Sequence, residues 1–194
     1  MNPTPEKTSV MPPFILMLFL YFIVGLFTVI NQQFQVPLKS ALLPHDGNMT
    51  NALVTLLNFS WFLAYPFSEG FATRWVDRLG YRKTSVYSLL IFIAGLGFYE
   101  AAVLLHIYAP SYITIMGNPI FTGFFIFLSG SFVIGMAVTI LQVVTGLYLD
   151  VNPVGKTTPL QRQMIGGTTN SIGMAIGPLV VSYIIFYGIP LHNV

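Results

Sequence analysis

Long stretches without charge are the feature that most constrains how this chain folds. No charged side chain occurs from residue 8 to residue 38, and none occurs from residue 101 to residue 149. An α-helix needs about 20 apolar residues to cross the hydrocarbon core of a bilayer, which is roughly 30 Å thick. Both stretches exceed that length, so we expect the chain to fold as membrane-spanning helices.

The composition agrees with a membrane protein and excludes several other classes. Apolar residues make up 55% of the 194 residues and charged residues 7%, with a mean hydropathy of +0.75, whereas soluble domains carry about 25% charged residues. The absence of cysteine excludes disulfides and thiolate metal sites. The net charge of +2 gives no basic surface for nucleic acid. No nucleotide-binding, zinc-protease or hydrolase motif is found, so we predict neither an enzyme nor a cofactor or metal.

The apolar runs predict five membrane spans in an all-α helical bundle. Charged residues and turn-forming segments separate the runs, and each run is far longer than the alternating segments of about 10 residues that build a membrane β-barrel. The approximate bounds of the spans are residues 12–38, 51–72, 84–106, 120–149 and 164–188.

The cations predict the orientation of these spans. If successive loops lie on alternate sides, Lys39 faces one side and the other cations face the opposite side. That second group is Lys7, Arg74, Arg78, Arg82, Lys83, Lys156 and Arg162. Loops rich in Lys and Arg remain in the cytoplasm. We therefore expect a multi-pass protein of the cytoplasmic (inner) membrane with its N-terminus inside the cell.

The loop between the second and third spans has an order that charge alone does not require. It reads "VDRLGYRK" over residues 76–83 and contains Asp77, Arg78, Gly80, Arg82 and Lys83. Glycine permits a tight turn, and an aspartate can pair with nearby cations or cap the positive end of a helix. The simpler alternative is a solvated loop that carries charge for topology alone.

Two predicted spans carry polar residues within stripes of small residues. The stripes are Gly135, Thr139, Gln142 and Gly146 in the fourth span, and Gly166, Asn170, Gly173 and Gly177 in the fifth. Spacings of 3 and 4 place each set on one helix face, where small residues allow close approach and polar side chains face the bundle. The second span adds Asn58, Trp61 and Tyr65 at the same spacing.

Uncharged amides beside aromatic rings suit a hydroxylated ligand. Hydroxyl groups need donors and acceptors, and the apolar face of a sugar ring packs on tryptophan or tyrosine. The alternative is that these amides bond one helix to another, each contributing about 1 kcal/mol. Asn31 and Gln35, at the end of the first span, are assigned to packing or to the mouth of the site.

Several segments resemble one transporter family. The loop resembles the major facilitator superfamily signature G-x-x-x-D-R-x-G-R/Y-K/R-K/R, with Thr73 in place of the leading glycine. Segments "NQQFQVPLK", "TILQVVTGLYL" and "QRQMIGGTTNSIGMAIGP" are similar to parts of its fucose:proton symporter and glucose/galactose permease branch. The resemblance implies a secondary transporter of a sugar or similar hydroxylated molecule that works by alternating access. It also implies that the loop is a gate holding the two transporter halves together.

We predict five substrate-binding residues: Gln33, Asn58, Trp61, Gln142 and Asn170. Gln142 and Asn170 combine the polar stripes with the resemblance, whereas Asn58 and Trp61 depend on the pairing of an amide with an aromatic ring. Gln33 stands where the family has an acid in the first span.

Proton coupling is where the resemblance and this sequence disagree. The family branch uses an acid on the first span and in some members a second on the fourth, but Gln33 and Gln142 cannot titrate. Glu100 falls well inside the third predicted span, whereas Glu69 marks the end of the second. An ionisable group within a membrane is a functional candidate, so Glu100 is a possible proton site. The alternative is that it reaches the outer interface and stays solvated.

The predicted spans cover less than a whole facilitator. The family has twelve spans in two six-helix halves, with the substrate between the halves. We therefore expect residues 1–194 to form most of an N-terminal half, with lipid, a sugar and a C-terminal half as partners and no nucleic acid. The alternative is a stand-alone five-helix membrane protein with an assembly or partner-binding role.

Overall fold

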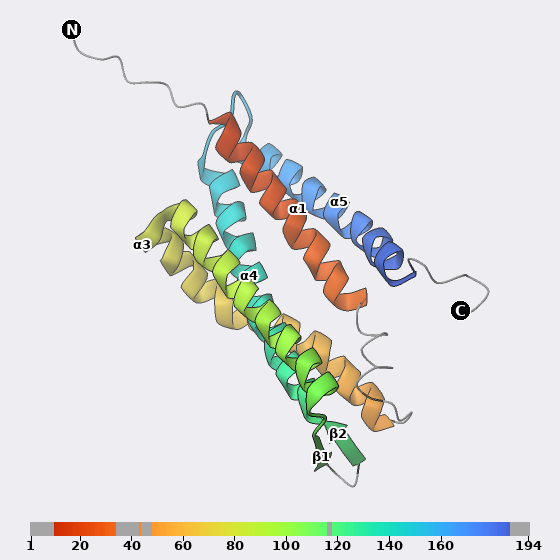
Figure 1. The fold of residues 1–194 in the computed structure, drawn as a ribbon. Coiled ribbons are helices and arrows are strands. Elements are labelled where there is room, and N and C mark those ends of the chain that lie inside the picture. Colours follow the sequence, from red (N-terminus) through yellow and green to blue (C-terminus); the bar gives the residue numbers. More distant parts are fainter. Residues whose placement is uncertain (1–9, 34–42, 44–47, 116–117, 187–194) are drawn as a thin grey trace.

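The computed structural model describes residues 10–33, 43, 48–115 and 118–186. Its elements, in chain order, are α1 (Met11–Gln33), α3 (Asn48–Tyr108), β1 (Tyr112–Ile115), β2 (Asn118–Phe121), α4 (Thr122–Val151) and α5 (Pro159–Phe186) (Figure 1). The four helices are long and apolar enough to cross a membrane. The prediction of a helical membrane protein is therefore confirmed.

The helices follow the predicted spans closely. α4 covers residues 122–151 where we predicted 120–149, and α5 covers residues 159–186 where we predicted 164–188. α1 begins at the expected position and is described to Gln33. Residues 34–38 and 187–188 of the predicted spans lie outside the described residues. The second and third predicted spans both fall within α3.

α3 consists of two helices that meet at Gly80. This residue has φ 77° and ψ 167°, a combination that is almost confined to glycine because any side chain would clash with the backbone. The chain is helical on both sides of this residue, so the predicted loop is reduced to a bend. The first arm of α3 (residues 48–79) and the second arm (residues 81–108) both run beside α4 (Figure 1).

α4 is the central helix of the bundle. It packs against both arms of α3 on one side and against α1 and α5 on the other, while α1 and α5 pack on each other (Figure 1). The approach to the first arm is close, because a Cβ atom added at Gly135 would lie 2.6 Å from the carbonyl oxygen of Trp61. The small-residue stripe of the fourth predicted span therefore faces α3.

The pairing of α1 with α5 also depends on glycine. A Cβ atom on Gly25 would collide with the backbone of Asn170, and one on Gly173 would collide with the carbonyl group of Phe22. Asn170 Nδ2 donates a hydrogen bond of 2.9 Å to the carbonyl oxygen of Tyr21. Backbone contact of this kind holds helices together in lipid, where apolar burial drives association little.

A buried arginine closes the connection between α4 and α5. Arg162, 2% exposed, donates from Nε to the carbonyl oxygen of Leu149 at 2.6 Å. Its Nη2 and Nη1 atoms donate to the carbonyl oxygens of Asp150 and Thr157, both at 2.7 Å. The last carbonyl groups of a helix lack intrahelical partners and carry partial negative charge, so they satisfy this cation.

A short hairpin occupies the predicted loop before α4. β1 and β2 pair in antiparallel register, with Tyr112 opposite Phe121 and Ile113 opposite Ile120. Strands of four residues are at the lower limit of the length at which alternation indicates a strand. The sequence therefore predicted a connection between the third and fourth spans but no strand within it.

The glycine contacts predict unequal effects of alanine on α5. Gly173→Ala should destabilise the protein by about 1–3 kcal/mol, because the added methyl group must separate α1 from α5. Gly167→Ala is the matched control, since a Cβ atom there meets no atom within 4 Å, and it should be neutral or stabilising through helix propensity. Thermal unfolding in detergent would measure both; equal midpoints would show that the backbones do not touch.

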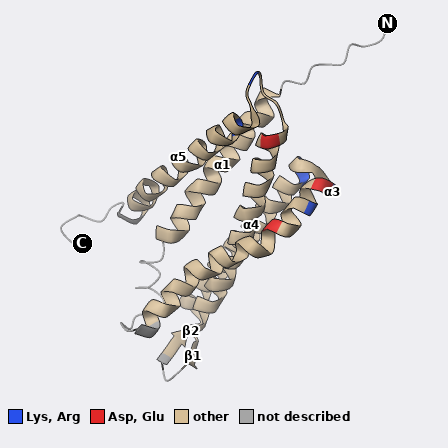
Figure 2. Ribbon diagram, turned by 180° about the vertical axis from the view of Figure 1, so that it is seen from behind, with Lys and Arg blue, Asp and Glu red and all other residues tan. Residues whose placement is uncertain are grey.

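The predicted orientation can be tested with introduced thiols, because the chain has no cysteine. Most charged residues gather near the bend of α3 and the end where α1 begins (Figure 2), which predicts that this end is cytoplasmic. Thr73 and Ser111 are both exposed. Ser111→Cys in intact cells should react with an impermeant maleimide, and Thr73→Cys only after permeabilisation. The reverse pattern would place the N-terminus outside.

Candidate functional site

A groove of about 640 Å³ opens between α1, the two arms of α3 and α4. Its aromatic lining is Phe27 from α1, Trp61, Phe92 and Tyr99 from α3, and Phe127 from α4. Its polar residues are Asn31 and Glu100, together with Tyr99 through its hydroxyl. The groove therefore combines apolar ring faces with a few polar groups, as small-molecule sites do.

Helical spacing explains why these side chains share one face of the second arm. Phe92, Leu96, Tyr99, Glu100 and Val103 follow one another at intervals of 4, 3, 1 and 3, so they project from the same side of the helix. α1 makes few close backbone contacts with α3. The side chains between these two helices consequently line an open groove.

Tyr99 joins the three walls of the groove. Its hydroxyl donates to Asn31 Oδ1 at 3.3 Å and lies 2.9 Å from Ser131 Oγ, which is buried on α4. Its ring stacks on Phe127 with centroids 3.9 Å apart and an angle of 3° between the planes. Tyr99 thus links α3 to α1 and α4 and fixes the orientation of the Asn31 amide.

Two buried polar atoms near the groove have no hydrogen-bond partner in the described part of the chain. They are Nε1 of Trp61, a residue that is 1% exposed, and Oδ1 of Asn58, one turn earlier on the same arm. The Trp61 indole N–H lies close to the Tyr65 hydroxyl, but the two do not meet hydrogen-bonding geometry. A buried polar group without a partner costs free energy, and this N–H is buried beside Tyr65, which does not line the groove.

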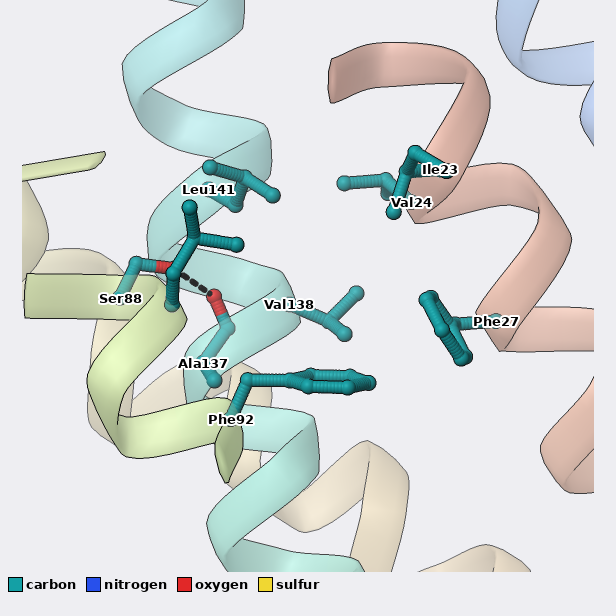
Figure 3. A pocket seen from close by; sticks show the side chains of 9 residues that line it. Ile23, Val24, Phe27, Ser88, Phe92, Ala137, Val138 and Leu141 are labelled. Carbon is teal, nitrogen blue, oxygen red and sulfur yellow. Dashed lines mark hydrogen bonds between the residues drawn. The ribbon is translucent and has the colours of Figure 1, made fainter. Parts of the chain in front are cut away.

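A smaller pocket continues the groove toward the middle of the bundle. Its volume is about 90 Å³, and its lining includes Val24 and Phe27 of α1 and Phe92 of α3 (Figure 3). The Ser88 hydroxyl in its wall donates to the carbonyl oxygen of Ala137 at 2.7 Å and is therefore satisfied (Figure 3). Phe27 and Phe92, with centroids 4.6 Å apart, belong to both spaces. The groove thus has an apolar floor.

The predicted substrate-binding amides have separate partners. Gln142 Oε1 accepts a hydrogen bond of 3.4 Å from the Tyr65 hydroxyl, whereas Asn170 binds the backbone of α1. Gln33 is exposed at the last described turn of α1. Of the predicted binding residues, Trp61 lines the groove.

The predicted gating residues surround the bend of α3. Asp77, Arg78, Gly80, Arg82 and Lys83 are all exposed. Arg82 also lines an open pocket of about 600 Å³ against the first turn of α1. Their gating role stays a prediction.

Sequence reasoning missed Tyr99 and Ser131, although it placed Asn31 at the mouth of the site or in packing. The spacing of Tyr99 with Phe92 and Val103 was a usable signal, because it puts the hydroxyl on an otherwise apolar face. Its partners on α1 and α4 could not be inferred without knowing which helices are neighbours.

Comparison with known proteins does not assign the chain to a family: no family model, curated protein or solved structure matches it. The resemblance to the major facilitator superfamily therefore depends on the quoted motifs alone. Among the described residues, no group of three or more His, Asp or Glu could hold a metal ion. The class that the structure defines is a helical membrane protein with a largely apolar groove that carries a few polar groups.

The hydrogen bonds of the groove predict a contrast between two conservative substitutions. Tyr99→Phe should destabilise the protein by about 1–3 kcal/mol, because it leaves Asn31 and the buried Ser131 without their shared partner. Trp61→Phe removes an N–H that has no partner, so it should lose apolar contact alone and cost less. Thermal unfolding without added solute would compare the two. A larger loss for Trp61→Phe would contradict this assignment.

Proposed function

We propose that this chain is a solute-binding part of a secondary transporter, and that a sugar or similar hydroxylated molecule binds in the groove. The observation that carries the proposal is the lining of the groove, in which the polar side chains of Asn31 and Glu100 stand among the rings of Trp61, Phe92 and Phe127. A groove of about 640 Å³ falls within the usual range of small-molecule sites, about 300–1,000 Å³.

The chemistry of the lining suits a ligand with hydroxyl groups. Asn31 offers an amide and Glu100 an acceptor, while the rings of Trp61, Phe92 and Phe127 offer apolar faces. A sugar presents both kinds of surface, since its hydroxyls point outward from the ring edge and its C–H groups cover the ring face.

Transport is supported by the order of the helices and by the motif at the bend. In this proposal α1, the two arms of α3, α4 and α5 are the first five spans of an N-terminal half of the major facilitator type, with the N-terminus in the cytoplasm. A second helical half closes the open side of the groove, and rocking of the halves gives alternating access. Glu100, which is exposed and lines the groove, is then placed to exchange a proton.

The alternative of an assembly protein draws less support from the contacts. Its basis was the pair of small-residue stripes, which suit a partner helix. Gly135 lies against the first arm of α3, and Gly166 and Gly173 lie against α1. These stripes therefore serve packing within the chain, and they no longer argue for a separate partner.

The proposal predicts that hexoses bind beside Trp61. The chain has two tryptophans, so Trp75→Phe leaves Trp61 as the only fluorescent tryptophan. In lipid nanodiscs free of sugar-headed detergent, a panel of glucose, galactose, mannose and fucose should include at least one that changes Trp61 emission saturably. No saturable change with any hexose would contradict the proposal.

Trp61 emission in the same variant can also distinguish binding in the groove from binding at the site predicted from the sequence. Asn31→Ala should weaken hexose binding by about 1–3 kcal/mol, because a half-buried polar partner in the lining is lost. Asn170→Ala is the matched control, since that amide binds the carbonyl group of Tyr21 and should alter stability more than affinity. The opposite ranking would move the site to α5.

A further inference from the structure

We infer that the solute bound in the groove carries an amine as well as hydroxyl groups, as an amino sugar does. The inference deepens the proposed function and rests on it. Three features of the groove support it: an acidic group without a basic neighbour in the lining, a wall of aromatic rings, and an amide donor at Asn31 in the same lining.

Charge is the first argument. Glu100 lines the groove, and the described lining residues include no lysine, arginine or histidine. A neutral sugar would cover this carboxylate and remove water from it without supplying a counter-charge, which is unfavourable. An ammonium group supplies both the counter-charge and N–H donors, and such charge-assisted hydrogen bonds are among the strongest in proteins.

Aromatic rings around the acid favour the same ligand. Tyr99 precedes Glu100 in α3, and the stacked pair of Tyr99 and Phe127 stands in the same lining as Trp61 and Phe92. The face of an aromatic ring is electronegative, so an ammonium group within about 6 Å of its centre is attracted to it. A lining of rings with one acid thus distinguishes an amine from a neutral polyol.

The hydroxyl groups of the ligand meet donors at Asn31. Asn31 Oδ1 accepts from the Tyr99 hydroxyl, which turns the amide so that its N–H groups are the ones that can serve a ligand. Asn31 therefore presents donors to the groove, and sugar oxygens are suitable acceptors. A donor at Asn31 and an acid at Glu100 match a molecule with oxygens and an ammonium.

Matched ligands and the single-tryptophan variant Trp75→Phe test this inference. Glucose, glucosamine and N-acetylglucosamine differ at one position, and the acetyl group removes the charge while keeping the nitrogen. The galactose and mannose series extend the comparison to other epimers. With the amine protonated, the preferred amino sugar should bind about 10-fold to 100-fold more tightly than its neutral relatives, the range for a charged hydrogen bond.

Substitutions at Glu100 test whether its carboxylate causes the preference for amino sugars over neutral sugars. Glu100→Gln should lower the affinity for the amino sugar to that for the neutral sugar, and Glu100→Asp, which retains the charge, should keep part of the preference. Glu69→Gln is the control, because Glu69 is exposed on the first arm and is not among the residues that line the groove.

The outcomes separate this inference from the proposed function. If neutral and amino sugars bind equally and Glu100→Gln changes neither affinity, the amine inference is wrong while solute binding in the groove stands. If the preference exists but survives Glu100→Gln, the acid is not its source and the inference is again overturned. If no sugar of either kind changes Trp61 emission saturably, both proposals fail together.

Discussion

Backbone contact at glycine is the interaction on which the rest of this structure depends. Lipid is as apolar as the helices, so helices associate in it through close packing rather than through exclusion of water. Gly135 brings α4 against the backbone of Trp61, and a Cβ atom on Gly130 would lie 2.8 Å from the ring of Tyr99. Two aromatic residues that line the groove are therefore positioned by glycines on the neighbouring helix.

The role of a polar residue in this bundle depends on whether the protein already satisfies it. Asn170 and Trp61 were both predicted as ligand-binding residues because they lie among small or aromatic neighbours. Asn170 donates to the carbonyl oxygen of Tyr21 and so joins α5 to α1. Trp61 has a buried N–H with no partner among the described residues. The first contributes to packing, and the second remains a buried donor without a hydrogen bond.

The sequence was informative wherever one helix determines the outcome. Charge-free runs predicted the helices, and the glycine in "VDRLGYRK" predicted the turn, because its left-handed backbone is open to few other residues. Spacing also predicted which face of α5 carries Asn170. Contacts between helices could not be predicted from the sequence. The periodicity within one helix does not show that Tyr99 lies beside Ser131, or that Gln142 lies beside Tyr65. The candidate site in the structure therefore lies nearer to α1 and the second arm of α3 than the site predicted from the sequence.

Arg162 fixes the bundle at one end and leaves it freer at the other. It ties α5 to the last carbonyl groups of α4, whereas the groove lies near Phe127, about 22 residues or roughly 33 Å further along α4. The walls of the groove belong to two helix pairs, α1 with α5 and α3 with α4. A tilt of about 5° between the pairs at Arg162 would shift α1 by roughly 3 Å at the groove. A rotation of the helix pairs about Arg162 would therefore change the width of the groove more than it would change the packing beside Arg162.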